Sequence, residues 1–322
     1  MHLLESAIRS EELLAKTIDV KYRFYASSSE PLQLKELLAM AAQNNDHQLI
    51  EAYHDHSLGY ADSGGSLDLR QQIATLYGDN ISASNIVVFP GAQTGMTLSA
   101  QALLHEGDHA IVITPSYQSL EESAKLAGCE ISRVSLSPDT NWQLDIADVE
   151  ATIQKNTRYI TLNDPHNPSG ALLDYDTKVA LIGLAEKYDL LIFSDEVYRL
   201  LELNPSERSP SMAELSARAI ALSTMSKPWG AGGTGIGWAV CQDSVICSQL
   251  LRAQHIYAVC FSRAGEIQAM MALRCSTEII NKNLTIIARN LALLEQYFDL
   301  NSDLFDWVAP RAGGTGFVRF KG

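Results

Sequence analysis

Short, nearly continuous apolar runs recur along the middle of this chain, and amphipathic stretches separate them. A strand that is apolar on both faces is buried on both faces, which is typical of a mostly parallel sheet covered by helices. The runs lie at 86–89, 110–113, 159–162, 190–193, 219–222 and 236–240. Helices are expected at 66–77, 93–105, 117–127, 145–154, 174–188 and 243–255. The sequence therefore predicts an α/β fold with a sheet sandwiched between helices.

A second, smaller domain is expected beside this unit. A long helical stretch from Ala264 to about Phe298 leads away from the apolar runs, and strand patterns follow at 304–308 and 316–320. We expect a large domain at 45–258 and a small α+β domain built from 1–44 and 259–322. Apolar residues in the first sixteen positions recur at helical spacing, and charges interrupt them, so a signal peptide is not expected there.

The charge balance narrows the classes of partner. Lys and Arg total 24 against 38 Asp and Glu, for a formal charge of −14, and no basic run stands out. Such a chain is a poor match for nucleic acid or an anionic membrane surface. The five cysteines have neither metal-ligand spacing nor a dense disulfide pattern. Reduced thiols in a cytoplasmic protein, with no bound metal, are the simplest interpretation.

Polar residues follow several of the apolar runs, at the ends where open parallel sheets bind their ligands. Lys227 follows the fifth run and precedes a proline and several glycines, so it cannot lie inside a helix. Buried, such a lysine is a candidate amine nucleophile or Schiff-base former, although a surface-loop lysine is equally compatible with this motif alone. Gly91-Ala92-Gln93 begins a helix, where free N–H groups and the helix dipole favour an anion.

Other strand ends add groups that suit a flat ring. Asp195 ends a fully apolar run and would be poorly hydrated there, so it is a partner for a protonated ring nitrogen or a cap for the next turn. Tyr198 and Asn167 are placed to hydrogen-bond a ring hydroxyl. Tyr117 could stack on a ring or be an ordinary rim tyrosine. Together these groups favour a planar, phosphorylated, basic heterocycle.

The order of these motifs resembles the class I/II aminotransferases, which are pyridoxal 5′-phosphate (PLP) enzymes of fold type I. The shared motifs are Gly-Ala-Gln, Pro-Ser-Tyr, Asn-Asp-Pro-His-Asn-Pro-Ser-Gly, Ser-Asp-Glu-Val-Tyr-Arg and Ser-Lys-Pro-Trp-Gly. They run from about Tyr60 to Trp238, and the last looks most like the branch that contains capreomycidine synthase. The resemblance implies a mostly parallel sheet of the seven-stranded type, and a homodimer with shared active sites.

The resemblance also implies a role for each motif residue. Lys227 would form the Schiff base with PLP and then shuttle a proton, and Asp195 would keep the ring nitrogen protonated. The remaining implied cofactor contacts are Tyr198 and Asn167 on the ring oxygen, Tyr117 on the ring face, and Gly91, Ala92, Gln93 and Thr224 on the phosphate. Tyr60 would reach the phosphate of the partner subunit; its alternative role is a turn aromatic that packs beside glycines.

Two departures from the family pattern stand out. Gly235 occupies the position where the family usually has a phosphate-binding arginine, so a charge-assisted contact of about 1.5–3 kcal/mol is absent unless Thr234 or glycine N–H groups replace it. The chain also stops at 316–322, in what resembles an early strand of the family's C-terminal domain. We therefore expect a fragment without the arginine that clamps the substrate carboxylate; Arg263 and Arg319 are possible substitutes, or ordinary exposed charges.

Three functions remain open at this point. The first is an aminotransferase that moves an amino group between an α-amino acid and a 2-oxo acid. The second is a PLP-dependent lyase or cyclase that acts on an amino acid, because the bond broken at Cα depends on its angle to the ring. The third is a non-catalytic, aminotransferase-like ligand-binding module, as in the sensor domains of some transcription factors. The lack of a DNA-binding helix-turn-helix pattern before residue 20 counts against this third function.

Overall fold

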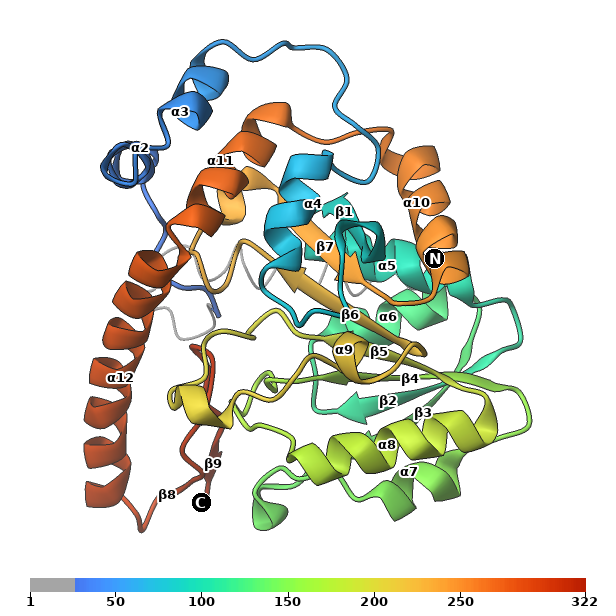
Figure 1. The fold of residues 1–322 in the computed structure, drawn as a ribbon. Helices are drawn as coiled ribbons and strands as arrows, with labels where there is room; N and C mark the ends of the chain where they lie inside the picture. The colour runs from blue at the N-terminus through green and yellow to red at the C-terminus, as the bar shows by residue number, and fades with distance from the viewer. Residues whose placement is uncertain (1–26) are drawn as a thin grey trace, which may run out of the picture.

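The central feature of the fold is a seven-stranded sheet with the order β1-β7-β6-β5-β4-β2-β3 (Figure 1). The structure, a computed structural model, describes residues 27–322. The helical spacing noted in the first sixteen residues lies outside the described residues. The strands are β1 (Ile86–Pro90), β2 (His109–Thr114), β3 (Glu130–Ser135), β4 (Thr157–Asn163), β5 (Leu191–Asp195), β6 (Ala219–Thr224) and β7 (Ile236–Val240).

Most strand pairs are parallel, as predicted. The pairs β2–β3, β2–β4, β4–β5 and β5–β6 are parallel, whereas β7 is antiparallel to both β1 and β6. Strand β1 therefore runs in the same direction as β6. The carboxyl ends of β1, β6, β5, β4 and β2 consequently lie at one edge of the sheet, and these are the strand ends from which the predicted site residues come.

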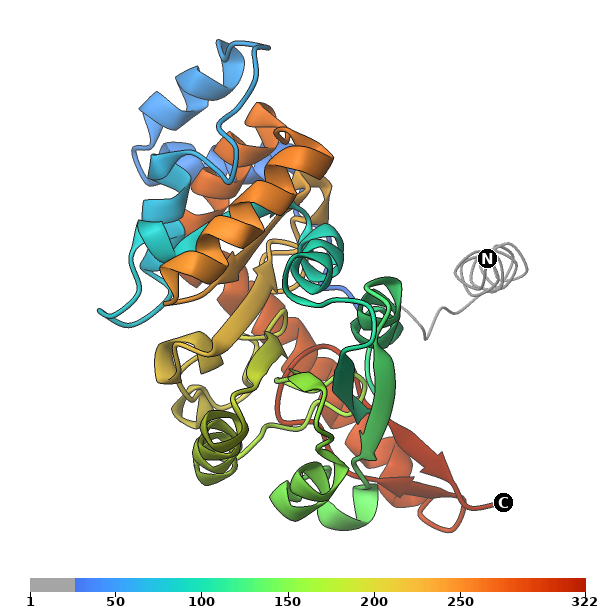
Figure 2. The same ribbon diagram turned by 90° about the vertical axis from the view of Figure 1, so that its right-hand side faces the viewer.

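Helices cover both faces of the sheet (Figures 1 and 2). In β1, Val87 and Phe89 belong to a core cluster with α5, α6 and α10, and Val88 between them belongs to a cluster with α4 and α11. A third cluster joins β2, β4 and β5 to α7 and α8. The helices are α4 (Leu67–Ala74), α5 (Ala92–Leu103), α6 (Gln118–Leu126), α7 (Ile146–Thr152), α8 (Tyr175–Tyr188), α9 (Met212–Leu215) and α10 (Ser244–Ala258). Alternate residues of one strand thus enter opposite cores, which explains the nearly continuous apolar runs.

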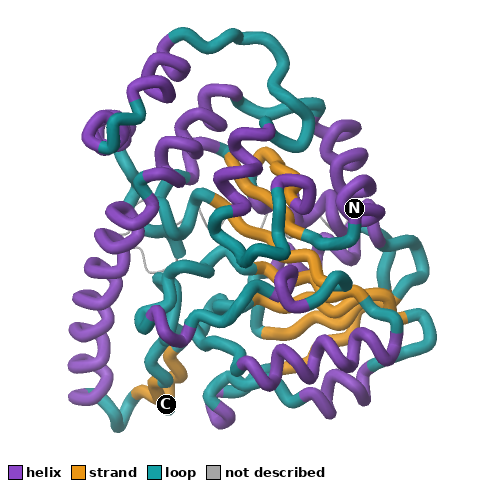
Figure 3. Tube along the Cα trace, viewed as in Figure 1, coloured by secondary structure: helices purple, strands orange, loops and turns teal. Residues whose placement is uncertain are grey.

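The remaining elements come from the two ends of the described chain. They are α2 (Leu34–Gln43), α3 (His47–His54), α11 (Arg263–Arg274), α12 (Ser276–Leu300), β8 (Phe305–Trp307) and β9 (Val318–Phe320). Strands β8 and β9 form an antiparallel pair. Figure 3 shows the strands of the large sheet gathered between helices, with α12 along one side. The proposed domain boundaries at 44/45 and 258/259 stay predictions.

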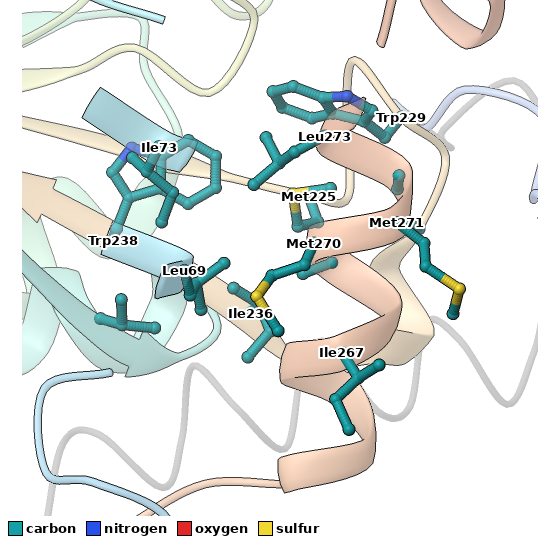
Figure 4. Packing of buried hydrophobic residues seen from close by; sticks show 14 of the residues in the cluster. Leu69, Ile73, Met225, Trp229, Ile236, Trp238, Ile267, Met270, Met271 and Leu273 are labelled. Carbon is teal, nitrogen blue, oxygen red and sulfur yellow. The ribbon is translucent and has the colours of Figure 1, made fainter. Parts of the chain in front are cut away.

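The predicted long helix near 264–298 is two helices in the structure. The helix is interrupted at Cys275, whose φ of −95° and ψ of 15° are not helical. The break lets α11 lie against the sheet while α12 runs away from it. Figure 4 shows Met270 and Leu273 of α11 directed toward the side where Ile236 and Trp238 of β7 lie. Among the described residues, no helix is long and apolar enough to cross a membrane.

Candidate active site

Lys227 is partly buried and lies just beyond the fully buried strand β6. Its ammonium donates hydrogen bonds to the carbonyl oxygen (2.9 Å) and the hydroxyl (3.1 Å) of Ser27, and lies 5.5 Å from the centroid of the Tyr198 ring. Burial lowers the pKa of Lys227, and the nearby Asp195 carboxylate partly opposes that shift. The structure therefore favours the reactive amine over a surface-loop lysine.

The loop after Lys227 is fixed by buried contacts. Asn283 of α12 donates to the carbonyl oxygen of Pro228 (2.9 Å), and the Trp229 indole, only 1% exposed, donates to Ser276 (2.8 Å). Gly230 has a φ of +60°, and a Cβ there would lie 2.2 Å from the carbonyl oxygen of Glu30. Only glycine fits this position, and the backbone that carries the lysine is held on both sides.

Asp195 is the last residue of β5, on the strand next to β6. Its side chain is buried, and its Oδ1 accepts a hydrogen bond from the backbone N–H of Val197 (3.2 Å). Burial raises the pKa of Asp195 to about 7, although the Val197 N–H and the Lys227 charge oppose the shift. The predicted turn cap is thus present. Because one N–H group and the Lys227 charge only partly offset the burial of this carboxylate, it also suits a cationic ring nitrogen.

Tyr198 and Asn167 lie beside this pair. The Tyr198 hydroxyl is buried and donates to the carbonyl oxygen of Ser27 (3.2 Å); burial raises its pKa to about 12. The backbone N–H of Asn167 donates to Oδ1 of Asn163 (2.5 Å), and Nδ2 of Asn163 donates to the carbonyl oxygen of Asp195 (2.7 Å). Asn163 therefore ties the end of β4 to the end of β5 and brings Asn167 to the site.

His166 connects the Asn167 loop to the segment that carries Tyr117. Its Nε2 faces the carbonyl oxygen of Pro115 (2.6 Å), which can only accept, so Nε2 carries the proton and Nδ1 accepts from the Ser169 hydroxyl (2.6 Å). Burial lowers the pKa of His166, in keeping with a neutral ring. Tyr117 itself precedes α6 and is 45% exposed, so its ring is free to cover a ligand.

The turn between β1 and α5 is where the sequence predicts an anion cradle, and that role stays a prediction. Gly91 precedes the helix with a φ of +84° and has no side chain to cap it, so the first N–H groups of α5 stay available to a ligand. Strand β7 lies directly against this turn, because a Cβ on Gly237 would be 2.4 Å from the Ala92 nitrogen. The hydroxyl of Thr224 at the end of β6 donates to the carbonyl oxygen of Ile236 (3.1 Å) and lies 3.1 Å from the Ser226 hydroxyl, so it must change partner to bind an anion. Gln93 is on the exposed side of the helix.

The sequence profile of the family described as aminotransferase class I and II matches residues 27–313. The chain belongs to this family.

Relatives and solved structures agree with that assignment. The chain is 32% identical over 245 residues to an arginine–pyruvate transaminase of Pseudomonas aeruginosa, covering 72% of this chain, and 29% identical over 231 residues to a capreomycidine synthase of Streptomyces vinaceus, covering 71% of this chain. It spans 61% of the length of the first relative and 59% of the length of the second. A PLP-dependent aminotransferase from Streptococcus suis superimposes with a TM-score of 0.89 at 27% identity, over 96% of this chain and 81% of that structure.

The residues described above fit the PLP of class I and II aminotransferases. The underpaired Asp195 suits the ring nitrogen, and the Lys227 amine lies close enough that each charge shifts the pKa of the other. The β1–α5 turn suits the phosphate. At the position of the family arginine, Gly235 has a φ of +65° and open space where a side chain would begin. Thr234 is not a good substitute, because its hydroxyl donates to the carbonyl oxygen of Ala231 (2.8 Å).

The two arginines considered for the substrate carboxylate have other partners. Arg319 on β9 pairs with Asp139 (3.0 Å) and with Asp306. Arg263 at the start of α11 pairs with the buried Glu266 (2.5 Å). Arg319 is an exposed strand charge, and Arg263 is a partly exposed charge at a helix start. Neither contacts Lys227 or Asp195 among the interactions of the described chain.

Tyr60 lies apart from the other cofactor residues. It is 89% exposed in the loop between α3 and α4, and it lines a cleft of about 390 Å³. That cleft is also lined by Asp62, Asp68 and Arg263, and by no other residue predicted to bind the cofactor. The alternative role as a packed turn aromatic is therefore wrong, because a packed ring would be covered.

Sequence reasoning missed two residues of the site. Ser27 was expected only as part of the small domain, yet its oxygens contact both Lys227 and Tyr198. Asn163 was given no role of its own as the first residue of the motif that follows the run 159–162, and the signal that could have revealed it is the placement of a buried amide at a strand end.

Proposed function

We propose that this chain is a PLP-dependent aminotransferase that moves an amino group between an α-amino acid and a 2-oxo acid. One observation carries the proposal: a part-buried lysine and a buried aspartate extend from adjacent parallel strands, and their charges are coupled. Family membership and the similarity to a transaminase support the same reaction.

Bound at this site, PLP would supply an electron sink that stabilises negative charge at the substrate Cα. Asp195 holds the proton on the ring nitrogen, and the buried position strengthens that ion pair because water does not screen it. Tyr198 and Asn167 would hold the ring oxygen, and Tyr117 would cover the ring face. The turn at Gly91 would place the N–H groups of Ala92 and Gln93 against the phosphate, and the Thr224 hydroxyl would join them after leaving its acceptor, the carbonyl oxygen of Ile236.

Lys227 then acts as the general base and acid at Cα. Its lowered pKa leaves more neutral amine at working pH than an ordinary lysine has, so Nζ can remove a proton from Cα. The same nitrogen, then an ammonium, would be able to give a proton back. The fixed backbone of Pro228 and Gly230 limits how far Nζ can move.

The protein is further proposed to be a cytoplasmic homodimer that acts in amino-acid metabolism. The exposed Tyr60 and Leu58, 89% and 94% exposed, favour a second copy that covers this loop and receives Tyr60 at its own phosphate site. Five free cysteines, four of them buried, favour a reducing compartment.

The test begins with the purified protein and PLP. We expect a yellow complex, and borohydride reduction should attach the cofactor to the peptide that contains Lys227. The control is Lys187→Ala, which removes an exposed lysine on α8 and should leave the labelling unchanged; Lys227→Ala should abolish it. A wild-type protein that takes up no PLP would contradict the proposal.

A second experiment separates amino transfer from other PLP reactions. Arginine, aspartate and alanine are suitable first donors, since relatives are named for them. Transamination would convert the cofactor to its pyridoxamine form and yield a new amino acid when a 2-oxo acid is added that differs from the donor's own product, such as pyruvate with arginine or aspartate. Ammonia with an oxo acid, or a ring-closed product, would instead support the lyase or cyclase alternative, which the similarity to a capreomycidine synthase keeps in view.

A further inference from the structure

The first and third of three consecutive serines, Ser27 and Ser29, form hydrogen bonds with Lys227. Both oxygens of Ser27 accept hydrogen bonds from the Lys227 ammonium, at 2.9 and 3.1 Å. The Ser29 hydroxyl donates to the backbone carbonyl oxygen of Lys227 (2.5 Å). Ser28, between them, is exposed. Residues 27 and 29 of an extended segment face the same side, so this segment presents two serines to one lysine.

The segment is anchored to the lysine loop at its other end as well. The backbone N–H of Leu32 donates to the carbonyl oxygen of Gly230 (3.0 Å), and the carbonyl oxygen of Glu30 lies against Gly230 where no Cβ fits. Residues 27–32 and 227–230 therefore lie against one another along their length. This contact fixes the position of Ser27 relative to Nζ.

The charged and titratable groups that face Nζ explain why the serine matters. The Asp195 carboxylate acts through space on Lys227, and the Tyr198 ring and hydroxyl lie beside it. Tyr198 shares its acceptor, the Ser27 carbonyl oxygen, with Lys227. The Ser27 hydroxyl is thus the acceptor on Nζ that a side-chain substitution can remove without altering the carboxylate or the phenol.

We propose that Ser27 is a positioning residue for Lys227. The two oxygens of Ser27 hold the free amine in one place and stabilise its ammonium form, in opposition to the burial that favours the neutral amine. Its catalytic meaning rests on the proposed function: whenever the lysine is not bound to the cofactor, Ser27 keeps Nζ at the site and ready to deliver a proton. The contact itself does not depend on the cofactor.

The test uses the full chain without PLP. Trace labelling with acetic anhydride across a pH series, with the Lys227 peptide quantified by mass spectrometry, gives the titration midpoint of that amine. Ser27→Ala removes an acceptor from the ammonium, so we expect a lower midpoint and about 2- to 10-fold faster labelling below it. Ser28→Ala is the matched control and should behave as wild type, and Ser27→Thr, which keeps the hydroxyl, should restore the wild-type midpoint.

An equal midpoint in Ser27→Ala and Ser28→Ala would overturn the proposal. So would a faster labelling rate in Ser27→Ala at every pH without a shift of the midpoint, because that result would mean the serine only covers the amine. With PLP bound, the acidic limb of the kcat profile, which reports the enzyme–substrate complex, should move in the same direction in Ser27→Ala. Failure of the proposed function has a separate signature, since a protein that takes up no PLP still gives the labelling result.

Discussion

At the scale of single residues, burial acts in opposite directions on two neighbouring groups. It raises the pKa of Asp195 to about 7 and lowers that of Lys227, because the charged form of each is poorly solvated. The free protein therefore holds a carboxylate that one backbone N–H and a nearby lysine only partly compensate. Burying this carboxylate lowers the free energy of unfolding, and a cation bound at Asp195 would remove that loss.

Asp195→Asn should therefore stabilise the PLP-free protein at alkaline pH. The folded-state pKa of about 7 exceeds the ordinary 3.8, so the folded chain binds the proton more tightly and loses stability as pH rises between these values. Asparagine does not titrate, and it keeps an acceptor for Val197. We expect a gain of about 1–4 kcal/mol in unfolding free energy at pH 8, measured by urea unfolding, and a much smaller gain at pH 5. An equal gain at both pH values would argue against a raised pKa.

Gly235→Arg tests the missing phosphate contact. A non-glycine residue in this left-handed conformation costs about 1–2 kcal/mol, and a charge-assisted contact contributes about 1.5–3 kcal/mol. We expect PLP affinity to rise by about 10- to 100-fold while the PLP-free protein loses about 1 kcal/mol of stability. Gly235→Gln has the same backbone strain without the charge and should lose stability without gaining affinity. Fluorescence titration with PLP measures both variants.

At the scale of elements, close contact between β7 and the β1–α5 turn shapes the anion cradle. Gly237 in β7 approaches the nitrogen of Ala92 and the carbonyl carbon of Gly91 so closely that a Cβ would lie 2.4 and 2.6 Å from them. The clash would be with backbone, which cannot rotate away as a side chain does. The cradle therefore depends on a glycine in a strand that contributes no ligand of its own.

Gly237→Ala should displace the β1–α5 turn. We expect a loss of about 2–4 kcal/mol in unfolding free energy and weaker PLP binding. Gly233→Ala is the matched control, because a Cβ there meets nothing within 4 Å and its φ is not in the left-handed region. Urea unfolding and PLP titration of both variants check the prediction, which would be contradicted if the two variants behaved alike.

At the scale of the whole molecule, the single chain leaves one predicted cofactor residue outside its own site. Tyr60 is 89% exposed in a loop beside Leu58, whereas Asp195 and Tyr198 are buried. A homodimer in which each subunit lends Tyr60 to the other would cover this loop and complete both sites. The proposal thus links assembly to cofactor binding.

A mixing experiment tests that sharing. Lys227→Ala and Tyr60→Ala variants should each have little activity alone. After unfolding and refolding together in equal amounts, half of the dimers are mixed and one of their two sites is intact, so about a quarter of wild-type activity should return. Mixing Lys227→Ala with the double variant Lys227→Ala/Tyr60→Ala restores no intact site and is the control. No recovery in the first mixture would mean that Tyr60 serves its own subunit or neither.

Local pattern was enough to predict most of the sheet and its site. Strands such as 86–89 and 219–222 are buried on both faces, and their consecutive apolar residues predict that burial. Asp195 and Lys227 follow two of these runs directly, so their placement at one edge needed only parallel neighbours. Strand β3 was missed because only Val134 is buried in it, and the break at Cys275 carries no glycine or proline to mark it.

By itself, then, the sequence determined the α/β class, the positions of the buried strands and the chemistry at their ends, because burial and turn geometry depend on near neighbours along the chain. Only the tertiary structure decided the strand order, the antiparallel β7 and the contact between Ser27 and Lys227, which are separated by 200 positions. A hydrogen bond between such distant segments depends on how the intervening elements pack, and no local pattern encodes that.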